Sequence, residues 1–280
     1  MDTDPLSDTV PPRYAVESDE EDEFNPLEKT SSQDEPLPKP EIKLVGDIPK
    51  GRSLVFATGD AGKYWAKGAK LSEQAAAVMV NNIQVGLVFT PSWTNSTIII
   101  SETFTRLPLN YMHDYSSFLL NELQPPSVSL LDVYPAPTYI SPEPIALQDA
   151  PIRYLSTTSV DSTIKSNAQP FSPPNMIHSN TSASLLASVG FKPSLKGTLI
   201  LLPFPRVPAP PPKTLQHSDF SHLSEDEYQW TETFMNTAQK LLFDAVGEEL
   251  KEAWHTPKNS HLPTSPSQAA STLGEGGMYI

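Results

Sequence analysis

Hydrophobic and polar positions alternate along the chain with two periods, which predicts a layered fold of strands and helices. Short runs of β-branched and other apolar residues, bounded by Gly, Pro or Asn, are typical of buried strands. The predicted strands are 53–58, 85–90, 97–101, 128–134, 152–157 and 197–202. Apolar residues at helical spacing predict helices over 64–81, 109–123, 181–188 and 224–254.

The order of these elements predicts an α/β fold class. Strands and helices that alternate over about 200 residues favour a single three-layer-like domain, in which helices flank one central sheet. Several neighbouring strands have no helix between them, so the sheet is predicted to be mixed. Asn180 or Thr181 is a candidate cap for the third helix, and Ser224 to Glu227 has capping-box spacing for the last. The polar segment 159–174 is expected to be mobile.

Both ends of the sequence lack the apolar content that a core needs. Residues 1–50 are proline-rich and acidic and are predicted to form a disordered tail. Ser18 precedes a run of acidic residues, a context suited to phosphorylation, but the pattern favours a solvated charge run over a modification site. The α/β body is predicted to span 51–255, and the Ser-, Thr- and Pro-rich residues 256–280 are predicted to form a flexible tail.

Composition narrows the classes of function. The 280 residues include 30 Pro and no Cys, and the formal net charge is -14. This charge, without a basic patch, disfavours nucleic-acid and anionic-membrane partners. The absence of Cys excludes disulfides and thiolate metal sites. With no apolar run of about 18 residues and no secretory pattern at the N-terminus, we expect a cytoplasmic or nuclear protein.

Motifs for catalysis or cofactor binding are not evident in the sequence. Residues 59–63 follow a predicted strand and resemble a phosphate loop, but Ala57 replaces the required earlier glycine and Tyr64 the required Ser or Thr. The six His residues have no metal-ligand spacing. We therefore predict no catalytic residues, no metal site and no cofactor, so the chain is not expected to be an enzyme.

The most informative motif is the final tripeptide Met278, Tyr279 and Ile280, which follows two glycines. An apolar residue, a tyrosine and a terminal carboxylate on a loose backbone can enter a pocket, where a lysine or backbone N–H groups capture the anion. The alternative interpretation is a frayed terminus that happens to end in apolar residues.

Taken together, the acidic N-terminal tail, the α/β body without catalytic motifs and the hydrophobic–Tyr–X end resemble the proteasome assembly chaperones. More narrowly, the chain is similar to the first subunit of the fungal heterodimeric chaperone that binds the proteasome α-ring. The segments that carry the resemblance are 54–59, 173–177, 184–187, 197–203 and 278–280.

This resemblance implies a non-catalytic adaptor that pairs with the second subunit of the chaperone heterodimer and caps the proteasome α subunits. Tyr279 would enter a pocket between adjacent α subunits, the Ile280 carboxylate would pair with a pocket lysine, and Met278 would add apolar contact. The complex would promote ring assembly and block premature binding of activators. The alternative is a scaffold unrelated to proteasomes, whose tail another carboxylate-binding partner captures.

Overall fold

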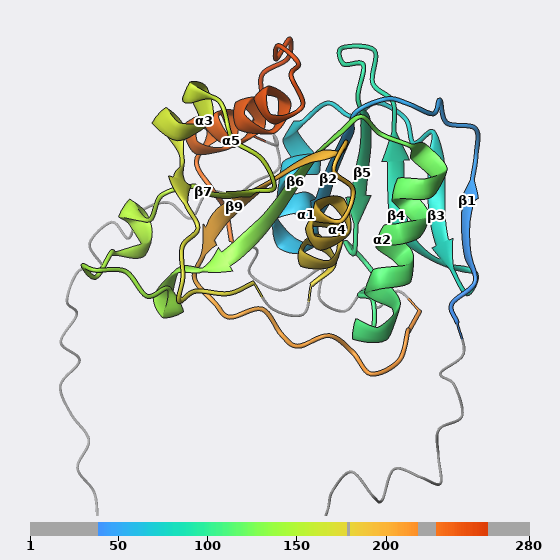
Figure 1. The fold of residues 1–280 in the computed structure, drawn as a ribbon, viewed down its shortest axis with the longest axis horizontal. Coiled ribbons are helices and arrows are strands. Elements are labelled where there is room, and N and C mark those ends of the chain that lie inside the picture. The colour runs from blue at the N-terminus through green and yellow to red at the C-terminus, as the bar shows by residue number, and fades with distance from the viewer. Residues whose placement is uncertain (1–38, 178–179, 218–227, 257–280) are drawn as a thin grey trace, which may run out of the picture. The chain divides into compact units, whose positions relative to one another are not determined.

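The computed structural model describes residues 39–177, 180–217 and 228–256. Within them, nine strands form one sheet (Figure 1). The strands are β1 (Ile42–Val45), β2 (Leu54–Thr58), β3 (Ala76–Val80), β4 (Ile83–Phe89), β5 (Thr97–Ser101), β6 (Ser127–Pro135), β7 (Arg153–Ser156), β8 (Gln169–Pro170) and β9 (Lys196–Phe204). The helices are α1 (Gly59–Gly68), α2 (Leu109–Leu123), α3 (Ser162–Asn167), α4 (Thr181–Gly190) and α5 (Glu232–Ala245), with short 3-10 turns at Ala136–Thr138 and Leu147–Asp149.

The sheet is mixed, with strand order β1-β3-β4-β5-β2-β6-β9-β7-β8. Its centre, β5-β2-β6-β9, is parallel. The pairs β1–β3, β3–β4, β4–β5 and β7–β9 are antiparallel, and β8 runs parallel to β7. The predicted α/β class with a mixed central sheet flanked by helices is therefore confirmed.

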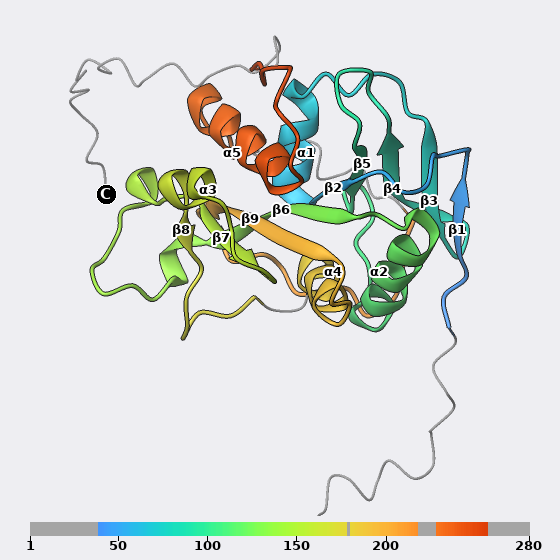
Figure 2. The same ribbon diagram turned by 45° about the horizontal axis from the view of Figure 1, so that its top comes forward.

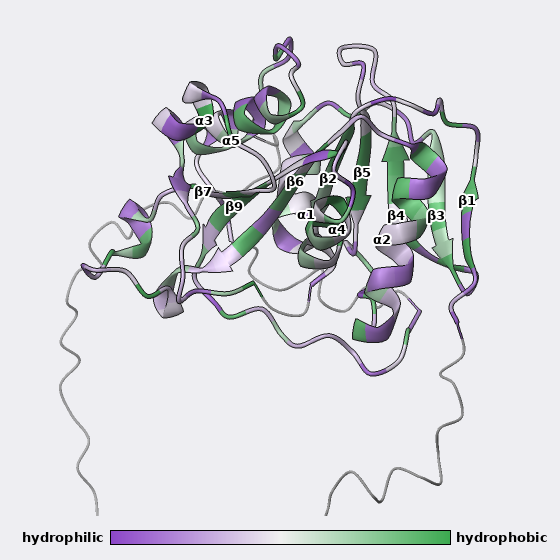
Figure 3. Cartoon of the chain, viewed as in Figure 1, coloured by the Kyte–Doolittle hydropathy of each residue, from purple (hydrophilic) through white to green (hydrophobic). Residues whose placement is uncertain are grey.

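Helices cover both faces of the central strands, so these strands are apolar on both sides (Figures 2 and 3). On one face α1 and α5 pack over residues such as Val55, Ile98 and Leu131. On the other face α2 and α4 pack over residues such as Phe56 and Leu130. We call these the α1/α5 face and the α2/α4 face.

The helix predicted over 64–81 is wrong in its second half. The helix α1 ends at Gly68, and after a turn the chain continues as β3. Asn81 and Asn82 both have positive φ, 48° and 63°, and join β3 to β4 as a tight hairpin. Consecutive left-handed residues suit the twist of a two-residue hairpin turn, so long-range pairing overrides the helical spacing of this Ala-rich segment.

The helix predicted over 224–254 is shorter in the structure. Thr231 caps α5, and its hydroxyl oxygen accepts a hydrogen bond from the Phe234 N–H at 3.3 Å. The helix ends at Ala245, and Gly247, with φ 76°, turns the chain away from the helix axis. The predicted capping box at 224–227 lies outside the described residues.

Two further segments are more ordered than the sequence suggests. β1 lies within the range 1–50 that we expected to be a tail, where Ile42 and Leu44 pack against the α2/α4 core. The segment 159–174, expected to be mobile, contains α3 and β8. Ile164 and Ala168 are buried in the α1/α5 core and Val160 packs against it, so a few apolar side chains anchor an otherwise polar stretch.

Candidate functional site

The predicted partner-binding residues Met278, Tyr279 and Ile280 lie outside the described residues, which end at Thr256. The structure instead shows how the chain is held immediately before residues 257–280. We call residues 248–256, which lie between α5 and the start of this segment, the tail root.

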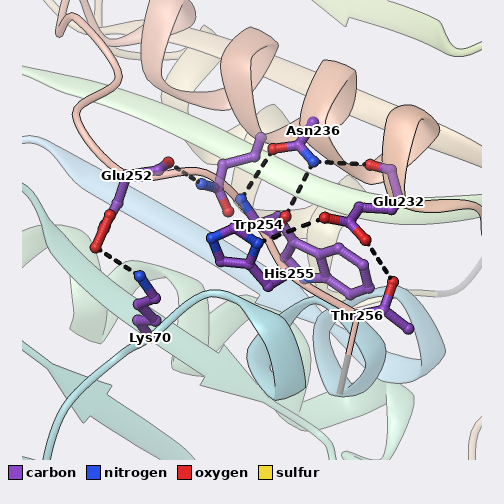
Figure 4. A network of polar contacts seen from close by, with 8 residues as sticks. Lys70, Glu232, Asn236, Glu252, Trp254, His255 and Thr256 are labelled. Atoms are coloured by element: carbon purple, nitrogen blue, oxygen red, sulfur yellow. Dashed lines mark hydrogen bonds and ion pairs between the residues drawn. The ribbon is translucent and has the colours of Figure 1, made fainter. Parts of the chain in front are cut away.

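The tail root is fixed by Trp254, whose side chain is fully buried (Figure 4). Its indole Nε1–H donates to the Trp65 carbonyl oxygen at 2.9 Å. Its ring lies 5.3 Å from that of Tyr64, measured between centroids. A buried Trp needs both an apolar contact and a hydrogen-bond acceptor, and α1 supplies both.

Two side-chain amides on α5 bind the backbone of the tail root. Asn236 accepts from the Trp254 N–H and donates to the Trp254 carbonyl oxygen, both at 2.9 Å. Gln239 donates to the Glu252 carbonyl oxygen at 2.7 Å and accepts from Trp65 Nε1–H at 2.9 Å. These neutral groups satisfy one another inside the fold, where an unpaired donor or acceptor would be destabilising.

The end of α1 closes the clamp at Gly68. Its carbonyl oxygen accepts from the His255 N–H at 3.1 Å. A Cβ atom at this position would lie 2.3 Å from the His255 carbonyl oxygen and 2.4 Å from Trp254 Cε2. The close approach of the tail root to α1 therefore requires glycine here.

Charged side chains complete the contacts at the surface. Lys70 Nζ lies 2.8 Å from Glu252 Oε1, and hydrogen bonding to this ammonium lowers the pKa of the Glu252 carboxyl. Glu232 accepts from the Thr256 hydroxyl at 3.0 Å and lies 3.4 Å from His255 Nδ1. Such exposed pairs contribute little to stability, so the buried contacts of Trp254 hold the root.

A second polar cluster lies at the carboxyl ends of the parallel strands, the usual ligand position in open α/β sheets. Glu102 follows β5 with φ 56°. Its carboxylate accepts from the Leu107 N–H at 2.8 Å and from the Thr58 hydroxyl at 3.2 Å. Burial raises the pKa of Glu102, and the hydrogen bonds from Leu107 and Thr58 offset only part of this rise.

Asp132 of β6 lies in the same cluster and is buried. Its carboxylate accepts from the Val133 N–H at 2.8 Å and from Asn180 Nδ2 at 2.9 Å. Burial, with a smaller contribution from the negative charges of Glu102 and Asp60, raises the pKa of Asp132 to about 7. The predicted cap is confirmed, because Asn180 Oδ1 accepts from the Ala183 N–H at 2.7 Å. No local sequence pattern indicates that the same amide also joins α4 to β6.

The contacts of Glu102 and Asp132 indicate that this polar cluster holds the protein's own elements together rather than binding an anion. The carboxylates hold the end of β2, the loop after β5 and the start of α4. The negative charges of Asp60 and Glu102 both act on Asp132 and raise its pKa, so carboxyl groups gather near the start of α1. A phosphate at this position would be repelled by them. Among the described residues no group of three metal-binding side chains occurs, and no helix is both long and apolar enough to cross a membrane.

Comparison with known proteins gives only distant similarity. No family model matches the sequence, and no curated protein matches it. PbaA from Pyrococcus furiosus, an archaeal homolog of proteasome-assembly chaperone, is similar with a TM-score of 0.42 and 12% identity, over 59% of this chain and 77% of that one.

Two other solved structures are similar at the same level. PbaB of the same organism, an archaeal proteasome activator, has a TM-score of 0.40 and 13% identity, over 57% of this chain and 79% of its own. A Mycobacterium tuberculosis proteasome-assembly chaperone homologue has a TM-score of 0.32 and 10% identity, over 54% and 75%. Because these scores lie below 0.5, the likeness carries no argument about function.

Proposed function

We propose that this chain is a non-catalytic subunit of a proteasome assembly chaperone, acting in the cytoplasm or nucleus. In this proposal the body, residues 51–255, pairs with a second chaperone subunit, and the heterodimer caps the α-ring. The support is the set of sequence segments that resemble this family, together with an α/β body whose polar clusters bind its own elements.

The observation that carries the proposal is a hydrophobic–Tyr–X end placed behind a firmly held root. Trp254 and its partners fix the point at which the tail begins. Treated as coil, residues 256–277 span on the order of 25 Å, which is enough to search a nearby pocket. The body would then position the search, and the tail would make the contact.

The chemistry of docking follows from the three terminal residues. The ring of Tyr279 would fill a pocket between adjacent α subunits, and the Ile280 carboxylate would pair with a lysine there. Met278 would supply adaptable apolar contact. A three-residue anchor is weak because ordering the tail costs entropy, so useful affinity requires simultaneous contact by the body.

Co-purification with α-ring intermediates tests the proposal. We expect Tyr279→Ala, and separately one extra residue after Ile280, to weaken this association while the fold and the heterodimer persist. Leu273→Ala is the matched control, because it removes an apolar tail side chain outside the tripeptide. Unchanged association of the Tyr279→Ala variant would contradict tail docking. Recovery of a carboxylate-binding partner without α subunits would favour the scaffold alternative.

A further inference from the structure

Arg153, the first residue of β7, is a buried cation without a carboxylate partner. Its side chain is 5% exposed, and no acidic group in the described part of the chain forms an ion pair with it. Nη1 donates to the Pro170 carbonyl oxygen at 3.2 Å, and Nε has no hydrogen-bond partner. The guanidinium lies 3.7 Å from the centroid of the Tyr139 ring and 5.6 Å from that of Tyr134.

A small recess opens beside this guanidinium. It has a volume of about 20 Å³, and Arg153, Tyr134, Tyr139, Ser141 and Ile145 are part of its wall. This volume suits one water-sized group, such as the end of a carboxylate. Aromatic contacts offset part of the unfavourable burial of a charge, and the planar guanidinium can still form paired hydrogen bonds with an oxyanion such as a carboxylate.

The surroundings of the recess are apolar and exposed. Ile145, which is 38% exposed, forms part of the wall, and Ile140, which is 62% exposed, lies in the chain between the wall residues Tyr139 and Ser141. Met176, which is 69% exposed, adjoins Asn175 on a second loop, so large exposed apolar side chains flank the recess on two loops. Asn175 joins the two loops that carry them, accepting from the Ile140 N–H at 2.7 Å and donating to its carbonyl oxygen at 2.8 Å. The Tyr139 and Phe171 rings also pack against each other, with their centroids 5.5 Å apart, and link the segment after β6 to the segment after β8. The surface is thus held in place before any partner arrives.

We propose that this surface docks a protein partner that inserts one Asp or Glu carboxylate beside Arg153 and lays apolar side chains on Ile140, Ile145 and Met176. A buried arginine at the centre of an apolar rim is the arrangement of an interface hot spot. The apolar rim favours a protein over a free anion. The net charge of -14 disfavours a second copy of this chain. The site lies on the body and does not depend on the tail tripeptide.

Peptide titration of the full chain tests the carboxylate requirement. The probes are N-acetyl-Leu-Glu-Leu-amide and, as the matched control, N-acetyl-Leu-Gln-Leu-amide, followed by the NMR signal of the Arg153 Nε–H. We expect a saturable shift with the Glu peptide and roughly tenfold weaker binding of the Gln peptide. In the Arg153→Lys variant most of the difference in affinity between the two peptides should be lost, because an ammonium group lacks the planar, forked donors of a guanidinium. Circular dichroism checks that this variant is folded.

Substitutions at exposed positions test the proposal without disturbing the fold. Met176→Glu should weaken binding of the Glu peptide by like-charge repulsion, whereas Phe191→Glu, at an 85% exposed position at the end of α4, should not. Equal binding of both peptides, or no saturable shift, would overturn the proposal. Acetate binding as tightly as the Glu peptide would indicate a small-anion site instead. A homodimer abolished by Met176→Glu would reassign the surface to a second copy.

The Tyr279→Ala variant separates this proposal from the function proposed for the tail. It should bind the Glu peptide as the unmodified chain does, even though its association with α-ring intermediates is weakened. Loss of peptide binding in this variant would contradict a recess that acts independently of the tail.

Discussion

The two faces of the sheet bury polar groups in different ways. On the α1/α5 face, Trp254 is held by the neutral amides of Asn236 and Gln239, and the indole and both amides have hydrogen-bond partners. On the α2/α4 face two of the buried polar residues, Asp132 and Arg153, are ionisable. Asp132 has a pKa raised to about 7, and the Nε of Arg153 has no partner.

The register of the sheet sharpens this contrast. Leu201 of β9 pairs with Asp132 on one side and with Arg153 on the other, so the two opposite charges lie in one row, separated by a strand. They form no ion pair in the described structure. Neutral, fully paired contacts are insensitive to pH, whereas separated buried charges respond to pH and to a partner. The α1/α5 face is therefore suited to holding the tail root, whereas the α2/α4 face is suited to responding to pH and to a binding partner.

Removing the centre of the clamp on the α1/α5 face should change the free energy of unfolding most. Trp254→Ala removes a fully buried indole and should lower the free energy of unfolding by about 3–5 kcal/mol. Denaturant unfolding of the full chain measures it. Phe191→Ala, at a highly exposed position, is the control and should change stability by less than about 0.5 kcal/mol. A comparably small effect of Trp254→Ala would show that the root is not part of the cooperative fold.

The next effect is a pH dependence that belongs to the α2/α4 face. The pKa of Asp132 is raised from 3.8 to about 7, so between these values the folded state binds its proton more tightly than the unfolded chain does. Stability should therefore fall as pH rises through this window, by roughly 2–4 kcal/mol, and level off above it. Asp132→Asn should flatten the slope, leaving a remainder from Glu102 and from Asp244 of α5, because burial also raises the pKa of each of these carboxyls.

Glu252, on the α1/α5 face, provides the control for this experiment. The pKa of Glu252 is lowered by Lys70, so its small contribution has the opposite sign and is lost as pH falls. Glu252→Gln should leave the slope between about pH 4 and about pH 7 nearly intact. A slope that Asp132→Asn does not change would contradict the burial of an ionisable carboxyl in β6.

The smallest effect compares two glycines at helix ends. Gly68→Ala places a Cβ against Trp254 and the His255 carbonyl and should destabilise the fold by about 1–3 kcal/mol. Gly190→Ala is the matched control, because the nearest atom to its Cβ lies at 3.8 Å. The difference in stability between the two variants should be equal at about pH 4 and about pH 8, since the Trp254 indole and the His255 carbonyl, which the new Cβ would meet, are uncharged. Equal stability of both variants would show that the root moves aside freely.

Local pattern predicted much of this fold. The helix over 109–123 and the cap at Asn180 are confirmed, and the central strands lie close to their predicted ranges. These elements follow from short-range causes: helical spacing, a capping amide and β-branched runs bounded by turn residues. The same reasoning was wrong for 76–80, where helical spacing was present but pairing with β4 decided the structure.

The candidate sites were harder to predict from local sequence patterns than the fold was. The tripeptide 278–280 can be read directly from the sequence, and its role stays a prediction. The clamp joins Trp254 to Trp65, which is 189 positions away, and no local pattern signals such a contact. The helix predicted over 224–254 included this tryptophan, because the turn at Gly247 was not recognised.

By itself, the sequence determined the fold class, the central strands, α2 and the cap of α4, because each depends on neighbours within a few positions. Only the tertiary structure decided that Trp254 returns to α1 and that Asp132 and Arg153 lie on either side of Leu201. Those placements depend on strand order and register, which arise when distant segments exclude water together. The burial of each charge, and hence its pKa and its availability to a partner, follows from that packing.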